Sequence, residues 1–315
     1  MIRITNNIKE FLENESGEIY LYGAGNAGYW TGFYMNRCGY AFEKYIDRDI
    51  RRADATYLGH EVVSLEYLKT CTGRKIRMII TPGCYEQILA ELLWMDHLET
   101  GLEILCYVPK YENIITHRKE YHINRMLGFF RRQLLTAPLP TIISNTCIAG
   151  NIYSLFDYIM LSPTINTGLD MEDFIKLCEN PRYYLEKDIG ELHWERDFGN
   201  PSRGEVCPVG MVDDIKIWFG HVDSEEGLTE RWNLMSKKVD YQNMLFIMTG
   251  MNPPVPLLKR FFALTSNRFY ISFNSNYGCD GTNGIYCPRN YFEESGSAIE
   301  NYFDIVGWIN EFGNE

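Results

Sequence analysis

The first third of the chain takes its fold from the stretch Glu18-Ile-Tyr-Leu-Tyr-Gly-Ala-Gly-Asn-Ala-Gly28. A short apolar run ends at Gly23, two more glycines follow at Gly25 and Gly28, and amphipathic sequence begins at Tyr29. This is the G-x-G-x-x-G spacing of a turn between a buried strand and a helix. The stretch therefore predicts a strand, a tight glycine turn and a helix, in that order.

The three glycines of this turn predict an anion-binding site. Gly23 permits the tight turn, Gly25 has no Cβ and lets a pyrophosphate approach the backbone, and Gly28 lets the helix pack close to the strand. The first free N–H groups of the helix, from Asn26 onward, then face the anion with the help of the helix dipole. We expect Gly23, Gly25, Asn26 and Gly28 to bind a cofactor.

An acidic residue stands where such folds place a ribose-binding carboxylate. The apolar run from Phe42 to Ile46 ends in Asp47, at the usual distance from the glycines. We therefore expect a nucleotide or a nucleotide-linked sugar. NAD is the less favoured ligand, because the domain is smaller than a full dinucleotide fold. The alternative is a βαβ unit that kept its tight turn and binds nothing.

Composition excludes several classes of protein. The 315 residues are 45% hydrophobic and 23% charged, and 42 acids against 30 bases give a net charge of −12. An acidic chain argues against a nucleic-acid partner. Residues 1–16 lack the apolar core of a secretion signal, and no apolar stretch approaches the length of a membrane span. We expect a cytoplasmic protein.

The cysteines and histidines show no metal-binding pattern. The nine cysteines are scattered and form no C-x-x-C pair. Without a secretion signal, they are expected to be reduced thiols. His and Cys do not gather at the spacing of zinc ligands, so no metal is expected.

The pattern of apolar runs predicts two α/β domains. In residues 1–115, strands are expected near 18–22, 42–46, 76–80 and 103–108, and helices near 2–13, 29–38, 65–71 and 84–96. Short continuous apolar runs are typical of a parallel sheet covered on both faces. This first domain is expected to be a small, doubly wound, Rossmann-like parallel sheet.

A helical connector is expected over residues 116–140. It carries Arg125, Arg131 and Arg132 beside apolar residues, so it could lie on a membrane surface or pack with its cations in solvent. The prolines of Thr136-Ala-Pro-Leu-Pro140 mark the boundary.

Residues 141–315 are expected to form a second, mostly parallel α/β sheet. Its strands are expected at 141–144, 213–219, 244–248 and 268–273, and the Gly- and Pro-rich segment 188–211 is expected to be a long loop. Polar segments follow all four strands, at 144–150, 221–224, 249–253 and 274–284. If the strands are parallel, these loops share the carboxyl edge, where open α/β sheets bind their ligands.

Within these loops, three residues are candidates for catalysis. His221 ends an apolar strand and could act as a general base, oriented by Asp223. Cys147 stands before an expected helix, whose dipole would make the thiol more nucleophilic. A hydrogen-bonded structural histidine and a small buried cysteine explain the same positions. Polar residues in and beside the loops are the candidates for binding substrate: Asn145, Ser162, Thr164, Asn274 and Asp280.

The second half resembles an uncharacterised bacterial domain found in exopolysaccharide and capsular-polysaccharide loci. The segments that carry the resemblance are Ser144-Asn-Thr-Cys147 with Gly150, Ser162-Pro-Thr164, Asp173-Phe174, Pro208-Val-Gly210, Asp214-Ile215, His221, Trp232 and Asn243. The first half is similar to the small nucleotide-binding domain attached to sugar-modifying enzymes of such loci. The resemblance implies a place in surface-polysaccharide biosynthesis and a possible association with membrane polysaccharide machinery.

Three functions are compatible with these observations. The first is a transferase or modifying enzyme that uses a nucleotide-linked sugar, with a glycan-type small molecule as its partner. In it, the glycine turn holds the diphosphate, Asp47 contacts the ribose and His221 deprotonates the acceptor. The second is a non-catalytic nucleotide-binding scaffold or sensor. The third is a hydrolase or acyltransferase that uses Cys147 with His221.

Overall fold

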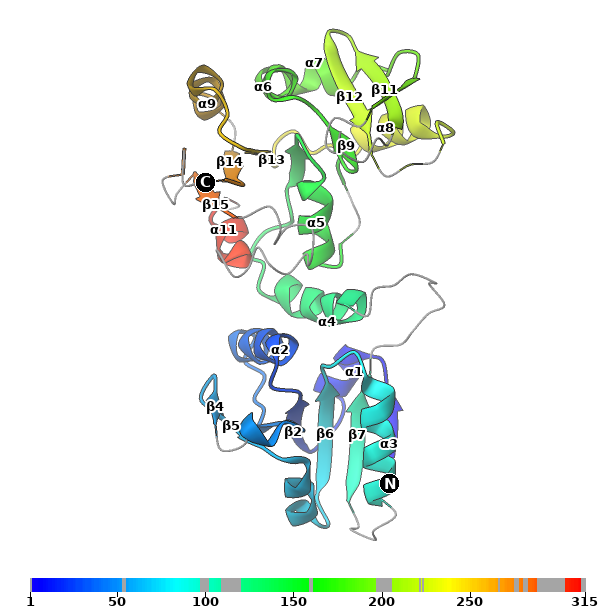
Figure 1. Cartoon of the computed structure of the whole chain (residues 1–315), viewed down its shortest axis with the longest axis vertical. Helices are drawn as coiled ribbons and strands as arrows, with labels where there is room; N and C mark the ends of the chain where they lie inside the picture. The colour runs from blue at the N-terminus through cyan, green and yellow to red at the C-terminus, as the bar shows by residue number, and fades with distance from the viewer. Residues whose placement is uncertain are drawn as a thin grey trace. The chain divides into compact units, whose positions relative to one another are not determined.

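The chain has an α/β fold, as predicted, and divides into two compact units, Met1–Leu134 and Leu135–Glu315. The computed structural model (Figure 1) describes residues 2–52, 55–96, 102–108, 120–158, 161–196, 206–220, 222, 224–265, 267–274, 278–279, 283–287 and 304–312. Among these residues, no helix combines the length and the apolar character needed to cross a membrane.

The first unit is built on one large sheet. Its elements are β1 (Ile2–Thr5), α1 (Ile8–Glu13), β2 (Glu18–Tyr22), α2 (Asn26–Arg37), β3 (Lys44–Ile46), the 3-10 helix η1 (Ile50–Arg52), β4 (Thr56–Tyr57), β5 (His60–Val63), the 3-10 helix η2 (Leu65–Cys71), β6 (Lys75–Ile80), α3 (Tyr85–Asp96), β7 (Glu103–Tyr107) and α4 (Glu120–Gln133). The strand order is β1-β7-β6-β2-β3-β5-β4. Every neighbouring pair is parallel except β4 and β5.

This strand order places a topological switch point at β2. From β2 the chain moves outward to β3 and β5, then crosses back to β6 and β7 on the other side. Doubly wound sheets bind their ligands at such a point, outside the carboxyl ends of the strands. The glycine turn that follows β2 lies there.

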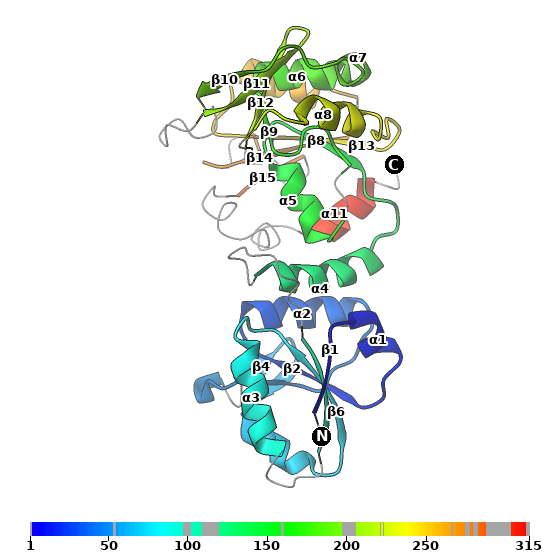
Figure 2. The ribbon, with the colours of Figure 1, turned by 90° about the vertical axis from the view of Figure 1, so that its right-hand side faces the viewer.

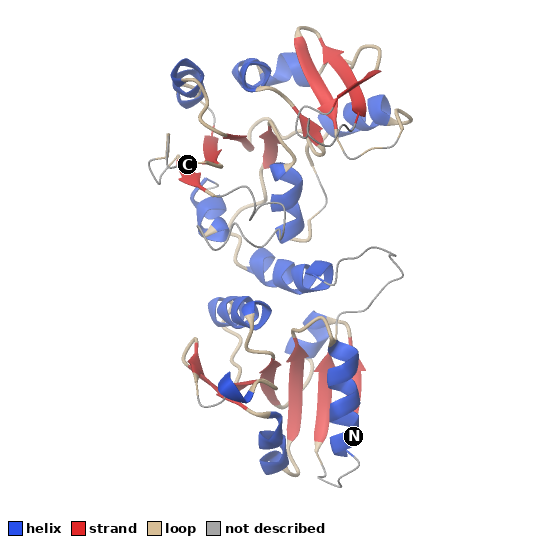
Figure 3. Ribbon diagram, viewed as in Figure 1, coloured by secondary structure: helices blue, strands red, loops and turns tan. Residues whose placement is uncertain are grey.

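Helices cover both faces of this sheet (Figure 3). On one face, Tyr20 and Met78 share a core with Ile88 and Leu92 of α3. On the other face, Tyr45 packs against α2, and its hydroxyl donates to the Gly28 carbonyl oxygen at 3.3 Å. Both faces are buried, which explains the continuous apolar runs in the strand sequences.

Helix α4, in the segment expected to connect the two domains, packs against α2 within the first unit (Figure 2). The Cys38 thiol donates to the Phe130 carbonyl oxygen at 3.4 Å. The Arg131 side chain is buried, with its guanidinium 5.0 Å from the centre of the Tyr34 ring. This cation therefore faces an aromatic side chain and not a membrane surface.

The helix expected over residues 2–13 begins later, so this prediction was wrong in its first turn. Ile2–Thr5 is β1, which pairs with β7 in parallel. Helix α1 starts at Ile8 because the Asn7 side chain caps it, accepting the Glu10 N–H at 3.1 Å. The alternating, β-branched residues before the cap favour a strand.

The second unit contains two sheets. Its elements are β8 (Thr141–Ser144), α5 (Ile148–Leu155), β9 (Thr167–Gly168), α6 (Met171–Glu179), α7 (Pro181–Leu185), β10 (His193–Arg196), β11 (Val206–Val212), β12 (Ile215–Phe219), α8 (Leu228–Ser236), β13 (Met244–Gly250), α9 (Val255–Phe262), β14 (Asn267–Ser272), β15 (Gly284–Tyr286) and α11 (Ile305–Phe312). One sheet is parallel, in the order β15-β14-β13-β8. The other is antiparallel, in the order β10-β11-β12-β9.

Two expectations for this unit were wrong. Strand β12 was expected in the parallel sheet, but it pairs with β11 and β9 in the antiparallel one. The segment 188–211 was expected to be a loop, but it contains β10 and most of β11. Gly210 weakens the strand signal in the sequence, since glycine is rare inside strands. Glycine is needed at this position because a Cβ would lie 2.5 Å from Ile189 Cγ2.

A single apolar core joins the two sheets through α6. Phe174 of α6 clusters with Ile217 of β12 and with Phe246 of β13. Its ring also lies 6.2 Å from the ring of Phe261 in α9. On the other face of the parallel sheet, Phe269 packs against Trp308 of α11.

Candidate functional site

The glycine turn is held by the strands on either side of it. Gly23 has a φ of +102° and donates its N–H to the Ile46 carbonyl oxygen at 2.7 Å. The Thr81 hydroxyl, at the end of β6, donates to the Tyr22 carbonyl oxygen at 2.9 Å. The turn is therefore tied to β3 on one side and to β6 on the other.

The fold explains two of the three motif glycines. A Cβ on Gly28 would lie 1.9 Å from the Gly23 carbonyl oxygen. A Cβ on Gly23 would lie 2.8 Å from Thr81 Oγ1, and the positive φ of Gly23 disfavours other residues. These two positions need glycine whether or not a ligand binds.

Gly25 differs, because the fold does not require glycine there. Its φ of −89° and ψ of −167° are open to any residue. The nearest atom to a Cβ at this position is Arg52 Nη1, at 3.6 Å, an ordinary contact. The motif glycine whose role would be to admit a phosphate is thus the one without a packing reason.

The N-terminus of α2 is open. Gly25 is the N-cap residue and has no side chain with which to cap the helix. Within the described part of the chain, no hydrogen bond is formed by the N–H groups of Asn26 and Ala27. Asn26 is exposed. Unpaired N–H groups and the helix dipole favour a bound anion at this end.

Asp47 reaches the turn, and its oxygens already have partners. Oδ2 accepts the Ala24 N–H at 2.7 Å, and Oδ1 accepts the Asp49 N–H at 2.8 Å. The side chain is 14% exposed. The carboxylate thus supports the glycine turn, and its contact with a ribose stays a prediction.

Arg52 holds the same residue, Ala24, through its carbonyl oxygen, a contact that the sequence did not reveal. Its Nη1 donates to the Ala24 carbonyl oxygen at 2.6 Å and lies 3.5 Å from Asp47 Oδ2. Both polar backbone groups of Ala24 are therefore held by one acid and one base. The only signal in the sequence was the basic pair Arg51-Arg52 shortly after the acid.

Arg51, the neighbour of Arg52, is placed differently. It bonds to Asp49 through Nε and Nη2, both at 2.8 Å, and its side chain is 86% exposed. The hydrogen bonds from Arg51 lower the pKa of Asp49 to about 2. Of these two adjacent arginines, only Arg52 contacts the glycine turn.

The second unit brings three of the four predicted loops to one edge. β8, β13 and β14 are parallel neighbours, so the segments after them leave the sheet at the same edge. The fourth loop, 221–224, follows β12 in the other sheet, so the four-loop site was wrong in this respect. His221, Asp223 and Asp280 lie outside the described residues.

The predicted substrate residue Asn145 binds the end of the neighbouring strand, β13. Its Nδ2 donates to the Thr249 carbonyl oxygen at 2.9 Å, and its Oδ1 accepts the Thr249 N–H at 2.7 Å. The Thr146 and Thr249 hydroxyls lie 2.9 Å apart. Asn145 is only 4% exposed, so its amide ties the segment after β8 to the end of β13 and does not face solvent.

The other predicted residues of this unit fall into two groups. Ser162 and Thr164 are buried, with their hydroxyl oxygens 3.0 Å apart, and Thr164 Oγ1 accepts the Ser144 N–H at 3.1 Å. Cys147 and Asn274 are more accessible. Cys147 precedes α5 as its N-cap residue, and Asn274 is exposed after β14.

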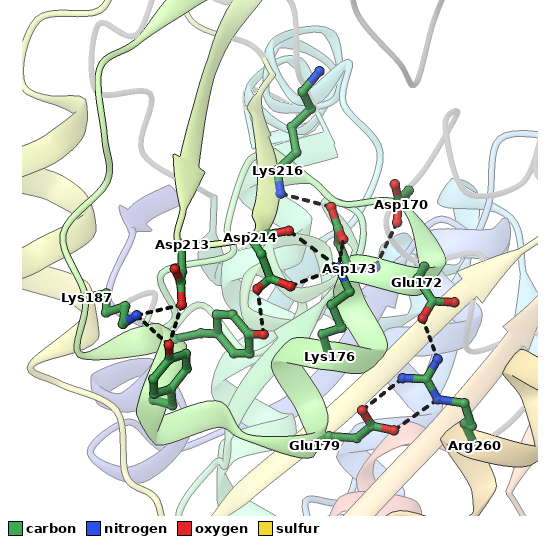
Figure 4. Close-up of polar contacts among 12 residues, drawn as sticks. Asp170, Glu172, Asp173, Lys176, Glu179, Lys187, Asp213, Asp214, Lys216 and Arg260 are labelled. Carbon is green, nitrogen blue, oxygen red and sulfur yellow. Dashed lines mark hydrogen bonds and ion pairs between the residues drawn. The ribbon is translucent and has the colours of Figure 1, made fainter.

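A polar cluster fastens the β11–β12 turn to α6 and α7 (Figure 4). Lys176 Nζ lies 3.1 Å from Asp173 Oδ1 and 3.2 Å from Asp214 Oδ2. The Tyr184 hydroxyl donates to Asp214 Oδ1 at 2.8 Å, and Asp173 Oδ2 accepts the Lys216 N–H at 2.9 Å. Asp173 and Asp214, which both carry the resemblance, thus meet at one lysine and hold the hairpin in place.

The sequence interpretation missed a histidine–carboxylate pair on β10. His193 Nε2 lies 2.7 Å from Glu195 Oε1, and Lys216 Nζ lies 2.8 Å from both oxygens of Glu195. The His193 side chain is 51% exposed. A His-x-Glu alternation places both side chains on one face of a strand. The pair was not predicted because 188–211 was expected to be a loop. Such a carboxylate can orient a general base.

The described residues contain no group of three or more His, Cys, Asp or Glu side chains able to hold a metal ion.

Comparison with known proteins places the chain in a family. The model of a domain of unknown function, DUF1919, matches residues 117–310, which is more than half of the chain. The chain belongs to this family.

One relative extends the comparison. The chain is 26% identical over 212 residues to an uncharacterised protein of Haemophilus influenzae. The alignment covers 64% of this chain and 97% of that protein. The glycine turn lies before the residues that the family model matches, so this match does not bear on the site at the turn.

Proposed function

We propose that the first unit binds the diphosphate of a nucleotide, or of a nucleotide-linked sugar, at the turn Gly23–Gly28. The observation that carries this proposal is Gly25. Packing and backbone conformation account for Gly23 and Gly28, but not for Gly25. A phosphate that approaches the backbone at this position accounts for the missing Cβ.

Three further features support the proposal. The turn lies at the switch point of a doubly wound sheet. The first N–H groups of α2 are open among the described residues. The Arg52 guanidinium lies beside Gly25, where a phosphate would come. The switch point locates a ligand site, and the open N–H groups and the guanidinium favour an anion over a neutral ligand.

The wider function proposed is a transferase or modifying enzyme of surface-polysaccharide biosynthesis that uses a nucleotide-linked sugar. Its basis is the resemblance of the second half to a domain of exopolysaccharide and capsule loci, together with the proposed diphosphate site. The second unit would then hold the acceptor. His221, or the His193–Glu195 pair, would remove the acceptor proton.

A thermal-shift screen tests the binding proposal, with UDP-sugars, GDP-sugars, NAD, NADP and S-adenosylmethionine as ligands. A ligand at one hundred times its dissociation constant adds about 2.7 kcal/mol to stability. Gly25→Ala should weaken binding at least tenfold and change the free energy of unfolding by no more than about 1 kcal/mol, the usual effect at an N-cap. Gly168→Ala is the control, because its Cβ would meet only Trp218 Cβ at 3.8 Å.

The outcomes of the screen separate the remaining functions. Stabilisation by a nucleotide-linked sugar, lost in Gly25→Ala, supports the proposal. Stabilisation by a ligand, with no turnover in a separate activity assay, favours the scaffold or sensor. No stabilisation of the wild type by any of these ligands would mean that the turn is a structural remnant.

The cysteine-dependent alternative rests on Cys147, the N-cap residue of α5, acting as a nucleophile with His221 as its base. Cys147→Ser and His221→Ala, each confirmed to fold, should be tested for surface-polysaccharide production in the native host. We expect Cys147→Ser to be tolerated and His221→Ala to lose function. The reverse ranking would favour thiol chemistry, and full function in both would favour a scaffold.

A further inference from the structure

We infer that Arg52 is the specificity residue of the glycine turn: it positions the turn through Ala24 and selects ligands that carry a diphosphate. The inference rests on the proposed diphosphate site and goes further, because it names the side chain that recognises the phosphates. It also assigns Asp47 a role other than ribose binding.

Two hydrogen bonds fix the backbone on either side of Ala24. Asp47 Oδ2 accepts the Ala24 N–H at 2.7 Å, and Arg52 Nη1 donates to the Ala24 carbonyl oxygen at 2.6 Å. The Gly23–Ala24 and Ala24–Gly25 peptides are thus each held by one of these bonds, so both have little freedom to rotate. The next N–H groups of the chain, at Gly25 and Asn26, are therefore set in place before a ligand arrives, which lowers the entropic cost of binding.

The Arg52 guanidinium stands beside the backbone of Gly25. Arg52 Nη1 lies 3.6 Å from the point where a Cβ of Gly25 would stand. A phosphate bound in the space left by the missing Cβ would lie next to the guanidinium. Arg52 Nη1 is bonded to the turn, Nε lies 3.9 Å from Asp49 Oδ2, and the side chain is 46% exposed. A planar guanidinium of this kind binds phosphate oxygens in pairs.

The positive charge of Arg52 offsets the negative charge of Asp47. A carboxylate at the N-terminus of a phosphate-binding helix opposes the incoming anion, and Asp47 lies there. Arg52 offsets this charge at 3.5 Å. Without Arg52, Asp47 would repel a diphosphate more strongly than a monophosphate, and would affect a neutral nucleoside least. The effect of Arg52 should therefore grow with the number of phosphates.

The test compares Arg52→Ala, Arg52→Lys and the control Arg51→Ala, which removes the adjacent, exposed arginine that does not contact the turn. Affinities for UDP, UMP and uridine, and for GDP, GMP and guanosine, are measured by calorimetry on the full chain at two salt concentrations. We expect Arg52→Ala to weaken diphosphate binding at least tenfold, monophosphate binding less and nucleoside binding little. Arg52→Lys should fall between, and Arg51→Ala should match the wild type.

A double substitution separates charge recognition from a loss of structure. Asp47→Asn keeps an oxygen for the Ala24 N–H but removes the negative charge. It should therefore restore part of the diphosphate affinity in the Arg52→Ala background. Equal losses for diphosphates and nucleosides, with no such rescue, would overturn the inference and leave Arg52 as a structural residue.

Two other outcomes overturn the inference in different ways. If the wild type binds diphosphates and Arg52→Ala binds them equally well or more tightly, Arg52 does not recognise the ligand, while the proposed function stands. If the wild type binds none of these compounds or the nucleotide-linked sugars, the inference and the proposed function fall together.

Discussion

The carboxyl edges of the two parallel sheets differ in where their polar groups point. In the first unit, the turn after β2 leaves backbone N–H groups of α2 open among the described residues. In the second unit, Asn145 and Thr249 bond to each other across the edge, and Ser162 and Thr164 are buried as a pair. Polar residues at a carboxyl edge are therefore not enough to indicate a ligand site. What matters is whether the protein already satisfies their hydrogen bonds.

The largest expected effect contrasts two glycines of the same turn. Gly28→Ala should destabilise the first unit by about 3 kcal/mol or more, because its Cβ would be forced against the Gly23 carbonyl oxygen at 1.9 Å. Gly25→Ala should cost no more than about 1 kcal/mol. Denaturant unfolding measures both changes. Similar losses at the two positions would show that Gly25 also serves the fold, which would remove the main support for the site.

The next effect tests whether the edge of the second unit is closed. Asn145→Ala should destabilise the chain by about 2–3 kcal/mol, because the buried N–H and carbonyl of Thr249 lose their partner. Asn274→Ala, at an exposed position after β14, should change stability by less than about 0.5 kcal/mol. Chemical denaturation again provides the measurement. A small effect at Asn145 would mean that water or a ligand can replace its amide, as at an open edge.

A smaller effect is expected at Asp47. Asp47→Ala should cost about 1 kcal/mol, because the Ala24 N–H loses an acceptor that is only partly shielded from solvent. Asp47→Asn should cost less, since the amide oxygen can still accept. Hydrogen exchange at the Ala24 amide, followed by NMR, reports the contact directly. Unchanged protection in Asp47→Ala would show that the acid does not hold the turn.

The smallest effect concerns the exposed turn between β11 and β12. The hydrogen bonds from Lys187 and Tyr183 lower the pKa of Asp213, and those from Tyr184 and Lys176 lower the pKa of Asp214. A carboxyl with a lower pKa in the folded state stabilises the fold above its unfolded pKa of about 3.9 and loses this contribution as the pH falls through the folded value.

Asp214→Asn should therefore be slightly less stable than the wild type at pH 7, and the difference should shrink as the pH falls below the unfolded pKa and through the lowered pKa of Asp214. Thermal unfolding between pH 7 and pH 3 gives the comparison, with Asp157→Asn as a control at an aspartate outside the β11–β12 turn. A difference that widens on acidification would contradict the sign of the shift.

Much of the first unit could be predicted because its signals are local. The apolar run 18–22, the three glycines and the start of α2 all lie in one continuous stretch, and each constrains the backbone directly. The second unit was harder to predict. Strand β12 looks like a buried parallel strand, and only its pairing with β11 and β9 shows otherwise. Pro208 and Gly210 made β11 resemble a loop, since both residues are rare inside strands.

The sequence by itself determined the strand, the turn and the helix around Gly23–Gly28, because backbone conformation and apolar periodicity depend on residues close together in the chain. It also placed Asp47 at the turn. Only the tertiary structure decided what these groups contact. It turned Asp47 toward the Ala24 N–H, brought Arg52 to Gly25 and closed the second edge through Asn145. Hydrogen-bond partners far apart in sequence are set by packing, and no local pattern records them.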